Sequence, residues 1–152
     1  MKSSEYKIPI SSLVVIYTKQ LDILLLSRSD KKNFWQSITG SLEKNESPYD
    51  AAKREVLEET GIMPENYLLE DWKLSHKYKI FSYWQYRYGP NVYFNTEHIF
   101  GLELPKKLPI TISPNEHNDF KWVSLDEAKK LVFSWTNVKA LEKLCEIKLL
   151  AS

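Results

Sequence analysis

Three glutamates, Glu55, Glu58 and Glu59, are spaced so that one turn of a helix places all of them on the same face. Like charges at this spacing destabilise an isolated helix by about 0.2–0.5 kcal/mol per pair. The glutamates also lie near the C-terminal end of the predicted helix, where the helix dipole disfavours anions. Because helix stability alone disfavours this arrangement, the cluster indicates a site that binds cations.

The surrounding segment, residues 40–62, reads GSLEKNESPYDAAKREVLEETGI and fits the pattern G-x5-E-x7-R-E-U-x-E-E-x-G-U, where U is a bulky aliphatic residue. A solvated acidic face is the ordinary explanation for neighbouring glutamates, but the flanking Gly40, Glu46 and Arg54 favour a metal site. Arg54 is suited to holding a carboxylate in a bidentate pair, with a surface ion pair to Glu58 as the alternative. Carboxylate oxygens suit Mg²⁺ or Mn²⁺, which lower the pKa of a bound water.

The glutamates must be carried by a helix, and its two ends are visible in the sequence. Ser47 suits the N-cap, Pro48 suits the first turn, and Asp50 adds a negative charge there. The helix should run to about Thr60, with Gly61 as its left-handed C-terminal stop.

The segments before and after this helix have the features of strands. Residues 13–17 and 23–26 are short apolar runs rich in β-branched residues, separated by a polar turn, and they predict a pair of strands. Two longer aromatic segments, residues 68–88 and 92–104, flank the turn Gly89-Pro90-Asn91 and predict a long antiparallel hairpin.

The C-terminal third predicts one more strand and two helices. Residues 111–119 form a polar loop, and residues 120–123 form a short strand. Residues 124–127, SLDE, are a capping box that opens a helix. A final amphipathic helix covers roughly residues 137–149. Together with the preceding hairpins, these elements predict an α+β fold or a three-layer sandwich.

Length, charge and cysteine content limit the class of protein. A chain of 152 residues is long enough for one domain, which we expect to span residues 1–152. The net charge of +1 gives no electrostatic case for nucleic acid or a membrane as partner.

The apolar run at residues 8–17 is too short to span a bilayer and lacks a cleavage site, so a strand is expected there. Cys145 is predicted to be a buried thiol; a single cysteine forms no disulfide within the chain, and we expect a cytoplasmic protein.

The pattern at residues 40–62 resembles the Nudix box, the signature of hydrolases that cleave nucleoside diphosphates linked to another group. This resemblance implies the Nudix α/β/α sandwich, with a mixed sheet and the box as a loop-helix-loop. It also implies Mg²⁺ as the cofactor, for which Mn²⁺ is a substitute, and a small molecule as the partner.

The resemblance extends along nearly the whole chain to the bacterial branch of this family that acts on dihydroneopterin triphosphate in folate biosynthesis. It rests on YKIPIS at residues 6–11, FWQSITGS at residues 34–41, RYGPNVYFNTE at residues 87–97 and SWTN at residues 134–137. Many members of the family have Pro-Gly-Gly where this chain has Thr39-Gly40-Ser41, which suits this branch. The implied reaction cleaves between the α- and β-phosphates and gives the monophosphate and pyrophosphate.

The same resemblance implies roles for individual residues. Glu55, Glu59 and Glu116 are the expected Mg²⁺ ligands. Glu58 and Glu116 are alternative general bases, and Arg54 belongs with them to the catalytic set. The residues expected near the substrate are Lys7, Arg28, Thr39, Tyr78, Lys79, Ile80, Phe81 and Ser134. His117 is expected to be a solvated loop histidine.

Two other functions remain open at this stage. The first is hydrolysis of another nucleoside triphosphate, such as dATP or a damaged nucleotide. Aromatic residues such as Tyr78 and Phe81 would then contact a different base. The structural alternative is that these side chains belong to the core. The second is a noncatalytic domain that only binds a nucleotide, which the complete set of box carboxylates argues against. The sequence does not indicate an oligomeric state.

Overall fold

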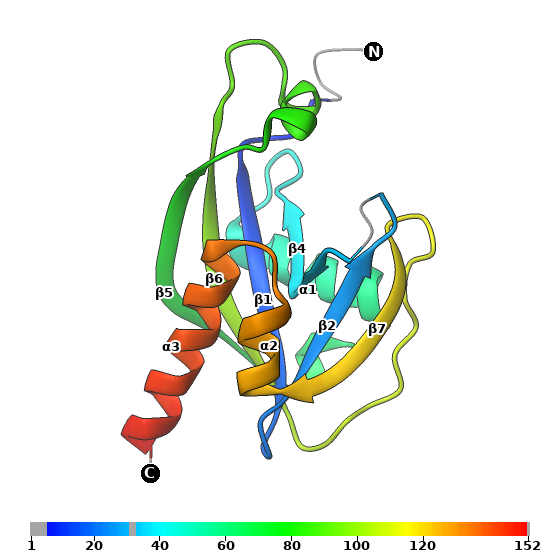
Figure 1. The fold of residues 1–152 in the computed structure, drawn as a ribbon, viewed down its shortest axis with the longest axis vertical. Helices are drawn as coiled ribbons and strands as arrows, with labels where there is room; N and C mark the ends of the chain where they lie inside the picture. Colours follow the sequence, from blue (N-terminus) through cyan, green and yellow to red (C-terminus); the bar gives the residue numbers. More distant parts are fainter. Residues whose placement is uncertain (1–5, 31–32, 152) are drawn as a thin grey trace.

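A mixed β-sheet forms the centre of the protein in the computed structural model, which describes residues 6–30 and 33–151 (Figure 1). Its strands are β1 (Ile10–Thr18), β2 (Asp22–Arg28), β3 (Trp35–Gln36), β4 (Ile38–Ser41), β5 (Leu68–Lys79), β6 (Phe94–Leu104) and β7 (His117–Ser124). The order is β3-β2-β1-β6-β5, with β4 also pairing with β1 and β7 with β2. β1 and β6 run parallel, and the other pairs are antiparallel.

Helices cover both faces of this sheet. Their bounds are α1 (Pro48–Thr60), α2 (Leu125–Leu131) and α3 (Trp135–Ala151), with the short 3-10 helices η2 (Pro64–Asn66) and η3 (Ser82–Tyr88). Figure 1 shows α1 behind the sheet and α2 and α3 in front of it. The three layers confirm the predicted α/β/α sandwich with a mixed sheet. Among the helices of the described residues, none is long and apolar enough to cross a membrane.

β1 contributes to both halves of the core because successive side chains of a strand point to opposite faces. Val14 and Ile16 pack in the core that includes Val56 of α1. Leu13 and Val15 pack in the other core, with residues of α2 and α3. A strand buried on both faces needs an uninterrupted apolar sequence, which explains the apolar run at this point of the chain.

The ends of α1 match the prediction. The Ser47 hydroxyl accepts a hydrogen bond from the Asp50 backbone N–H at 3.1 Å, and the Ser47 N–H donates to the Asp50 carboxylate at 3.2 Å. Gly61 follows the helix with φ of 75°, and its N–H donates to the carbonyl of Leu57. A left-handed residue costs least as glycine, so the position of Gly61 determines where the helix stops.

The predicted hairpin of β5 and β6 is confirmed, but its first strand ends earlier than expected. The N–H of Ile80 donates to the carbonyl of Tyr93 at 2.8 Å, and the chain between them leaves the sheet and forms η3. The rings of Phe81 and Trp84 lie 6.0 and 6.1 Å from the ring of Phe133, near the start of α3. Packing between distant aromatic residues therefore overrides the strand preference of this segment.

Four details of the C-terminal third also differ from expectation. β7 begins at His117, so this histidine opens a strand instead of lying in a loop. Ser124 caps α2 by accepting a hydrogen bond from the N–H of Glu127 at 3.2 Å, but the return bond of the predicted capping box is absent from the described residues. Helix α3 starts at Trp135, slightly before the predicted boundary. Cys145, on α3, is half-buried, whereas a fully buried thiol was expected.

Candidate active site

The acidic end of α1 meets the start of β7. Glu55 and Glu59 are buried, with exposed fractions of 8% and 1%, whereas the side chain of Glu58 is half-exposed. Oxygen atoms of Glu59 and Glu116 and a ring nitrogen of His117 all lie within 4.8 Å of one another. Of the three box glutamates, two thus face inward together, and the chain brings Glu116 to them from outside the box.

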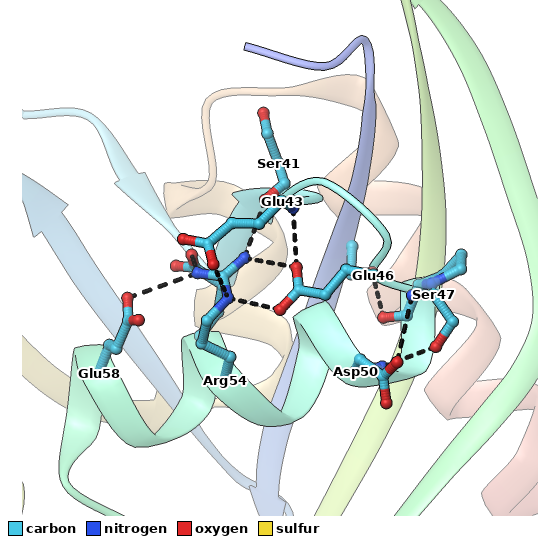
Figure 2. A network of polar contacts seen from close by, with 10 residues as sticks. Ser41, Glu43, Glu46, Ser47, Asp50, Arg54 and Glu58 are labelled. Carbon is cyan, nitrogen blue, oxygen red and sulfur yellow. Dashed lines mark hydrogen bonds and ion pairs between the residues drawn. The ribbon is translucent and has the colours of Figure 1, made fainter. Parts of the chain in front are cut away.

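Arg54 connects the helix to the loop that precedes it (Figure 2). Its Nε and Nη2 donate to the two carboxylate oxygens of Glu46 at 2.7 and 2.9 Å, and Nη2 also donates to the carbonyl of Ser41 at 3.0 Å. Its Nη1 donates to Glu55 Oε1 at 2.5 Å and reaches Glu58 only at 3.5 Å. The predicted bidentate pair is therefore present, with Glu46, and Arg54 also fixes the direction of Glu55.

Gly40 of β4 lies directly against Glu55. A methyl group at Gly40 would overlap the carboxyl group of Glu55. Gly40 does not have a left-handed backbone, so its role is not a special backbone shape. Its missing side chain lets the strand approach the carboxyl group of Glu55, which any larger residue would have to displace.

All three carboxyl groups have raised pKa values, for Glu55 and Glu59 mainly because of burial and for Glu116 mainly because of Glu59. Burial raises the pKa of Glu55 to about 7, against the opposing effect of Arg54. A hydrogen bond with Glu59 is the main cause that raises the pKa of Glu116 to about 7, and burial raises the pKa of Glu59. Oxygen donors that crowd together in this way suit a divalent cation, which would take the place of the shared protons. Of the three predicted ligands, Glu59 and Glu116 belong to a group that could hold a metal ion, with His117 as its third member, whereas Glu55 is buried nearby but lies outside that group.

His117 is not the solvated histidine that the sequence suggested, because it is only 3% exposed. Burial lowers its pKa to about 4, so the imidazole is neutral near pH 7. Its Nδ1 lies against Glu59 Oε2, and the side-chain amide of Gln36 lies 3.4 Å from its Nε2. Neither Nδ1 nor Glu59 Oε2 has a hydrogen-bond partner among the described residues, so the two atoms are in contact without a hydrogen bond. His117 thus packs against Glu59 without a charge of its own.

Two adjoining cavities lie next to this cluster. We call the first the acidic cavity, because Glu55, Glu58 and Glu116 line it. We call the second the aromatic cavity, because Phe81, Trp84, Phe133 and Trp135 line it. The wall common to both includes Lys7, Arg28, Thr39, Gly40, Ser41 and Arg87. A ligand is therefore able to occupy both cavities at once by lying across that wall.

The shared wall carries three cations. Arg28 forms a bidentate pair with Asp30 at 2.8 Å, and Arg87 donates to the same carboxylate at 3.1 Å. Desolvation, followed by the charges of Arg87 and Arg28, lowers the pKa of Lys7. Asp30 pairs with the two arginines, and Glu55 and Glu116 also act on Lys7, so the wall offers cations to the phosphates of a ligand on the side that adjoins the acidic cavity.

The structure gathers all of the predicted substrate residues around the aromatic cavity. Its lining includes Lys7, Arg28, Thr39, Tyr78, Lys79, Ile80, Phe81 and Ser134. Residue-by-residue prediction missed Arg87, Trp84 and Glu97, which line the same cavity. A signal was present, because Arg87 and Glu97 are the first and last residues of the stretch at residues 87–97 on which the resemblance partly rests.

Comparisons with known proteins agree with this geometry. The NUDIX domain model matches residues 7–144. The dihydroneopterin triphosphate diphosphatase of Escherichia coli strain K12 is 42% identical over 146 residues, which cover 94% of this chain and 96% of that protein. The diphosphatase of the same name from Haemophilus influenzae is 39% identical over 142 residues, covering 91% and 89%. The solved structure of the E. coli dihydroneopterin triphosphate pyrophosphohydrolase aligns with a TM-score of 0.86 over 91% of this chain and 95% of that one.

The raised carboxyl pKa values predict how the stability of the metal-free protein changes with pH. Glu55 and Glu116 hold protons up to about pH 7 in the folded state, whereas an unfolded glutamate loses its proton near pH ~4.3. The folded state binds more protons between these values, so this contribution to stability is lost as pH rises through 7.

With a chelator present, Tm should fall from about pH 5 to pH 8 more steeply than in the double variant Glu55→Gln/Glu116→Gln. Adding Mg²⁺ at about pH 8 should raise Tm in the unmodified protein only. If Tm changed equally with pH and rose equally with Mg²⁺ in both proteins, Glu55 and Glu116 would not have the proposed proton-binding and cation-binding roles.

The fork of Arg54 gives a second prediction. Arg54→Lys keeps the charge but loses the two parallel hydrogen bonds to Glu46 and the fixed contact to Glu55. We expect the apparent affinity for Mg²⁺ to fall roughly 10- to 100-fold, which is the range seen when partners of metal ligands are removed. Mg²⁺ titrations of turnover measure this. Lys53→Ala, at the neighbouring position outside the acidic cavity, is the matched control and should leave the titration unchanged. An unaltered titration in Arg54→Lys would show that the fork has no part in holding the ligands.

Proposed function

Because this chain belongs to the Nudix family, as its sequence predicts, we propose that it hydrolyses dihydroneopterin triphosphate to dihydroneopterin monophosphate and pyrophosphate. The single observation that carries the assignment is a cationic wall shared by an aromatic and an acidic cavity. Proteins named for this activity are 39–42% identical over nearly the whole chain. A role in folate biosynthesis follows from the same resemblance.

The proposed substrate has two parts that match the two cavities. Its flat pterin bicycle fits the aromatic cavity, where the rings of Phe81 and Trp84 lie 5.5 Å apart at 71°. Its triphosphate then crosses the wall of Lys7, Arg28 and Arg87 and reaches the acidic cavity. Binding at both ends fixes the phosphorus that is attacked relative to the carboxylates, which converts binding energy into rate.

We assign the metal site to Glu55, Glu59 and Glu116, with Mg²⁺ as the cofactor and Mn²⁺ as a substitute. A bound Mg²⁺ neutralises phosphate oxygens and lowers the pKa of a water molecule. Arg54 holds Glu55 in place, and neutral His117 packs against Glu59. Both therefore act as positioning residues, although Arg54 was predicted to belong to the catalytic set itself.

The attacking water must lose a proton to a base within hydrogen-bond reach. We assign this role to Glu58, because it lines the acidic cavity and is the one of the three clustered glutamates of α1 that is not assigned to the cation. Its side chain is half-exposed, and its hydrogen bond to Arg54 is long at 3.5 Å. Glu116, the alternative base, is better suited to the metal because it shares a hydrogen bond with Glu59.

We also propose that the partner is a free small molecule and that the protein is cytoplasmic. The net charge of +1 provides no extended basic surface for nucleic acid or for anionic lipid. The cations that gather on the shared wall serve a ligand of a few phosphates. A chain with one cysteine makes no internal disulfide, which suits a reducing compartment.

Glutamine substitutions distinguish a metal ligand from a base. Glu59→Gln and Glu116→Gln remove a charged ligand, so we expect large losses of activity that higher Mg²⁺ partly restores. Glu58→Gln should lower kcat by roughly 10²- to 10⁴-fold at saturating Mg²⁺ without shifting the Mg²⁺ dependence. Turnover measured against Mg²⁺ concentration tests all three. If Glu116→Gln behaves as described for Glu58→Gln, the two assignments must be exchanged.

Product analysis tests the substrate. With Mg²⁺ present, dihydroneopterin triphosphate should give pyrophosphate and the monophosphate, and its kcat/KM should exceed those of dATP and GTP. Stacking alone does not explain such a preference, because every base has a flat face. Chromatography of the products and parallel kinetics on the three substrates decide the point. Higher kcat/KM for dATP, or stepwise release of orthophosphate, would replace this substrate with another and leave the family unchanged.

A further inference from the structure

Glu97 of β6 is a buried carboxyl group that the reaction described above does not use. It is 4% exposed and lies inside the sheet, in register with Ser11 of β1 and His76 of β5. It lines the aromatic cavity but not the acidic cavity. It therefore belongs to the part of the site that would hold the base of the substrate and not to the part that would hold the phosphates.

The hydrogen bonding of Glu97 is incomplete. The hydroxyls of Thr136 and Thr39 donate to its carboxyl group, but Oε1 has no partner among the described residues. Burial raises the pKa of Glu97 to about 7, and only the two hydroxyls act against this, so no cation among the described residues compensates for its charge. A buried acceptor without a partner costs free energy, which is recovered when a ligand supplies the missing donor.

We propose that Glu97 recognises the base of the substrate by accepting hydrogen bonds from the ring N3–H and the 2-amino group of the pterin. This inference rests on the proposed function, because it names the residue that would make the site select a pterin. The hydroxyls of Thr136 and Thr39 occupy the other oxygen, so Oε1 is the acceptor that is left, and its two lone pairs can accept from the N3–H and the amino group. The same donor pair occurs in guanine, as N1–H and the 2-amino group. Adenine has no such pair at this edge.

The position of Glu97 agrees with the shape of the ligand. In dihydroneopterin triphosphate, the side chain that carries the phosphates leaves the bicycle at the end opposite the amino group. A donor edge at Glu97 therefore leaves the phosphates at the far end of the ligand, and Lys7, Arg28 and Arg87 line both this cavity and the acidic cavity that would receive them. Phe81 and Trp84 remain available to contact the flat face of the bicycle.

Glu97→Gln tests this assignment, because the amide replaces one acceptor with a donor that faces a donor of the ligand. We expect the kcat/KM ratio of dihydroneopterin triphosphate to dATP to fall roughly 10- to 100-fold, and the ratio of GTP to dATP to fall with it. The matched control is Glu103→Gln, on the same strand and outside both cavities, where the carboxylate pairs with Lys148 at 2.7 Å. Both ratios should stay unchanged in this control. Equal losses on all three substrates, or unchanged ratios, in Glu97→Gln would overturn the proposal.

The unmodified protein separates this inference from the proposed function. If it prefers dATP to dihydroneopterin triphosphate, the proposed function fails, while the ratio of GTP to dATP still tests Glu97. If Glu97→Gln does not fold, binding to the unmodified protein is compared for pterin and for lumazine, in which an oxygen replaces the 2-amino group. Pterin should bind roughly tenfold more tightly, because lumazine places an acceptor against the carboxylate. Equal affinities would overturn the role of Glu97.

Discussion

Placing Glu55 and Glu59 inside the protein, next to the exposed Glu116, costs free energy, because two carboxylates are removed from water and lie near another negative charge. Much of the surrounding structure limits this cost. Arg54 places a guanidinium against Glu55, and the imidazole that lies against Glu59 is neutral. The remaining negative charge is the driving force for binding a divalent cation. A site with full internal compensation would have no reason to bind one.

The fold makes this arrangement possible by bringing together segments that are distant in the sequence. β4 places Gly40 against the side chain of Glu55, where no larger residue fits. β7 pairs with β2, in a register that sets His117 opposite Arg28. The same pairing thus places the acidic residues near one of the cations of the shared wall. The sheet is therefore both the support of the site and the element that sets the distance between its opposite charges.

The parts of the site determined by local chemistry could be predicted from the sequence. The ends of α1 depend on Ser47, Asp50 and Gly61, whose preferences operate within a few residues, and they were predicted correctly. The bidentate pairing of Arg54 with a box carboxylate was likewise visible in the spacing. The layers of the sandwich, by contrast, came from the resemblance to a family as much as from the apolar pattern.

The errors concern residues whose environment is made by contacts distant in sequence. The segment at residues 80–88 has the composition of a strand, yet its rings pack against Phe133 from a later part of the chain. His117 looked solvated because its neighbours in sequence are polar, and it is buried because β7 places it against Glu59 and Gln36. Glu97 was missed for the same reason, since an acidic residue in a strand has no local signal of burial. Its environment depends on β1 and β5 pairing on either side of β6.

The division of the site into two cavities separates two physical tasks. Charge on the triphosphate is the same for every nucleoside triphosphate, so the roles proposed for the acidic cavity and the cationic wall would not select a base. The aromatic cavity contacts a flat ring, which also discriminates poorly, because dispersion and stacking depend little on which base is present. Selection therefore requires a buried polar group whose hydrogen bonds are satisfied by one base and left unsatisfied by another. Such a group is costly in the empty protein, and a central strand covered on both sides by neighbouring strands is rigid enough to hold it in position.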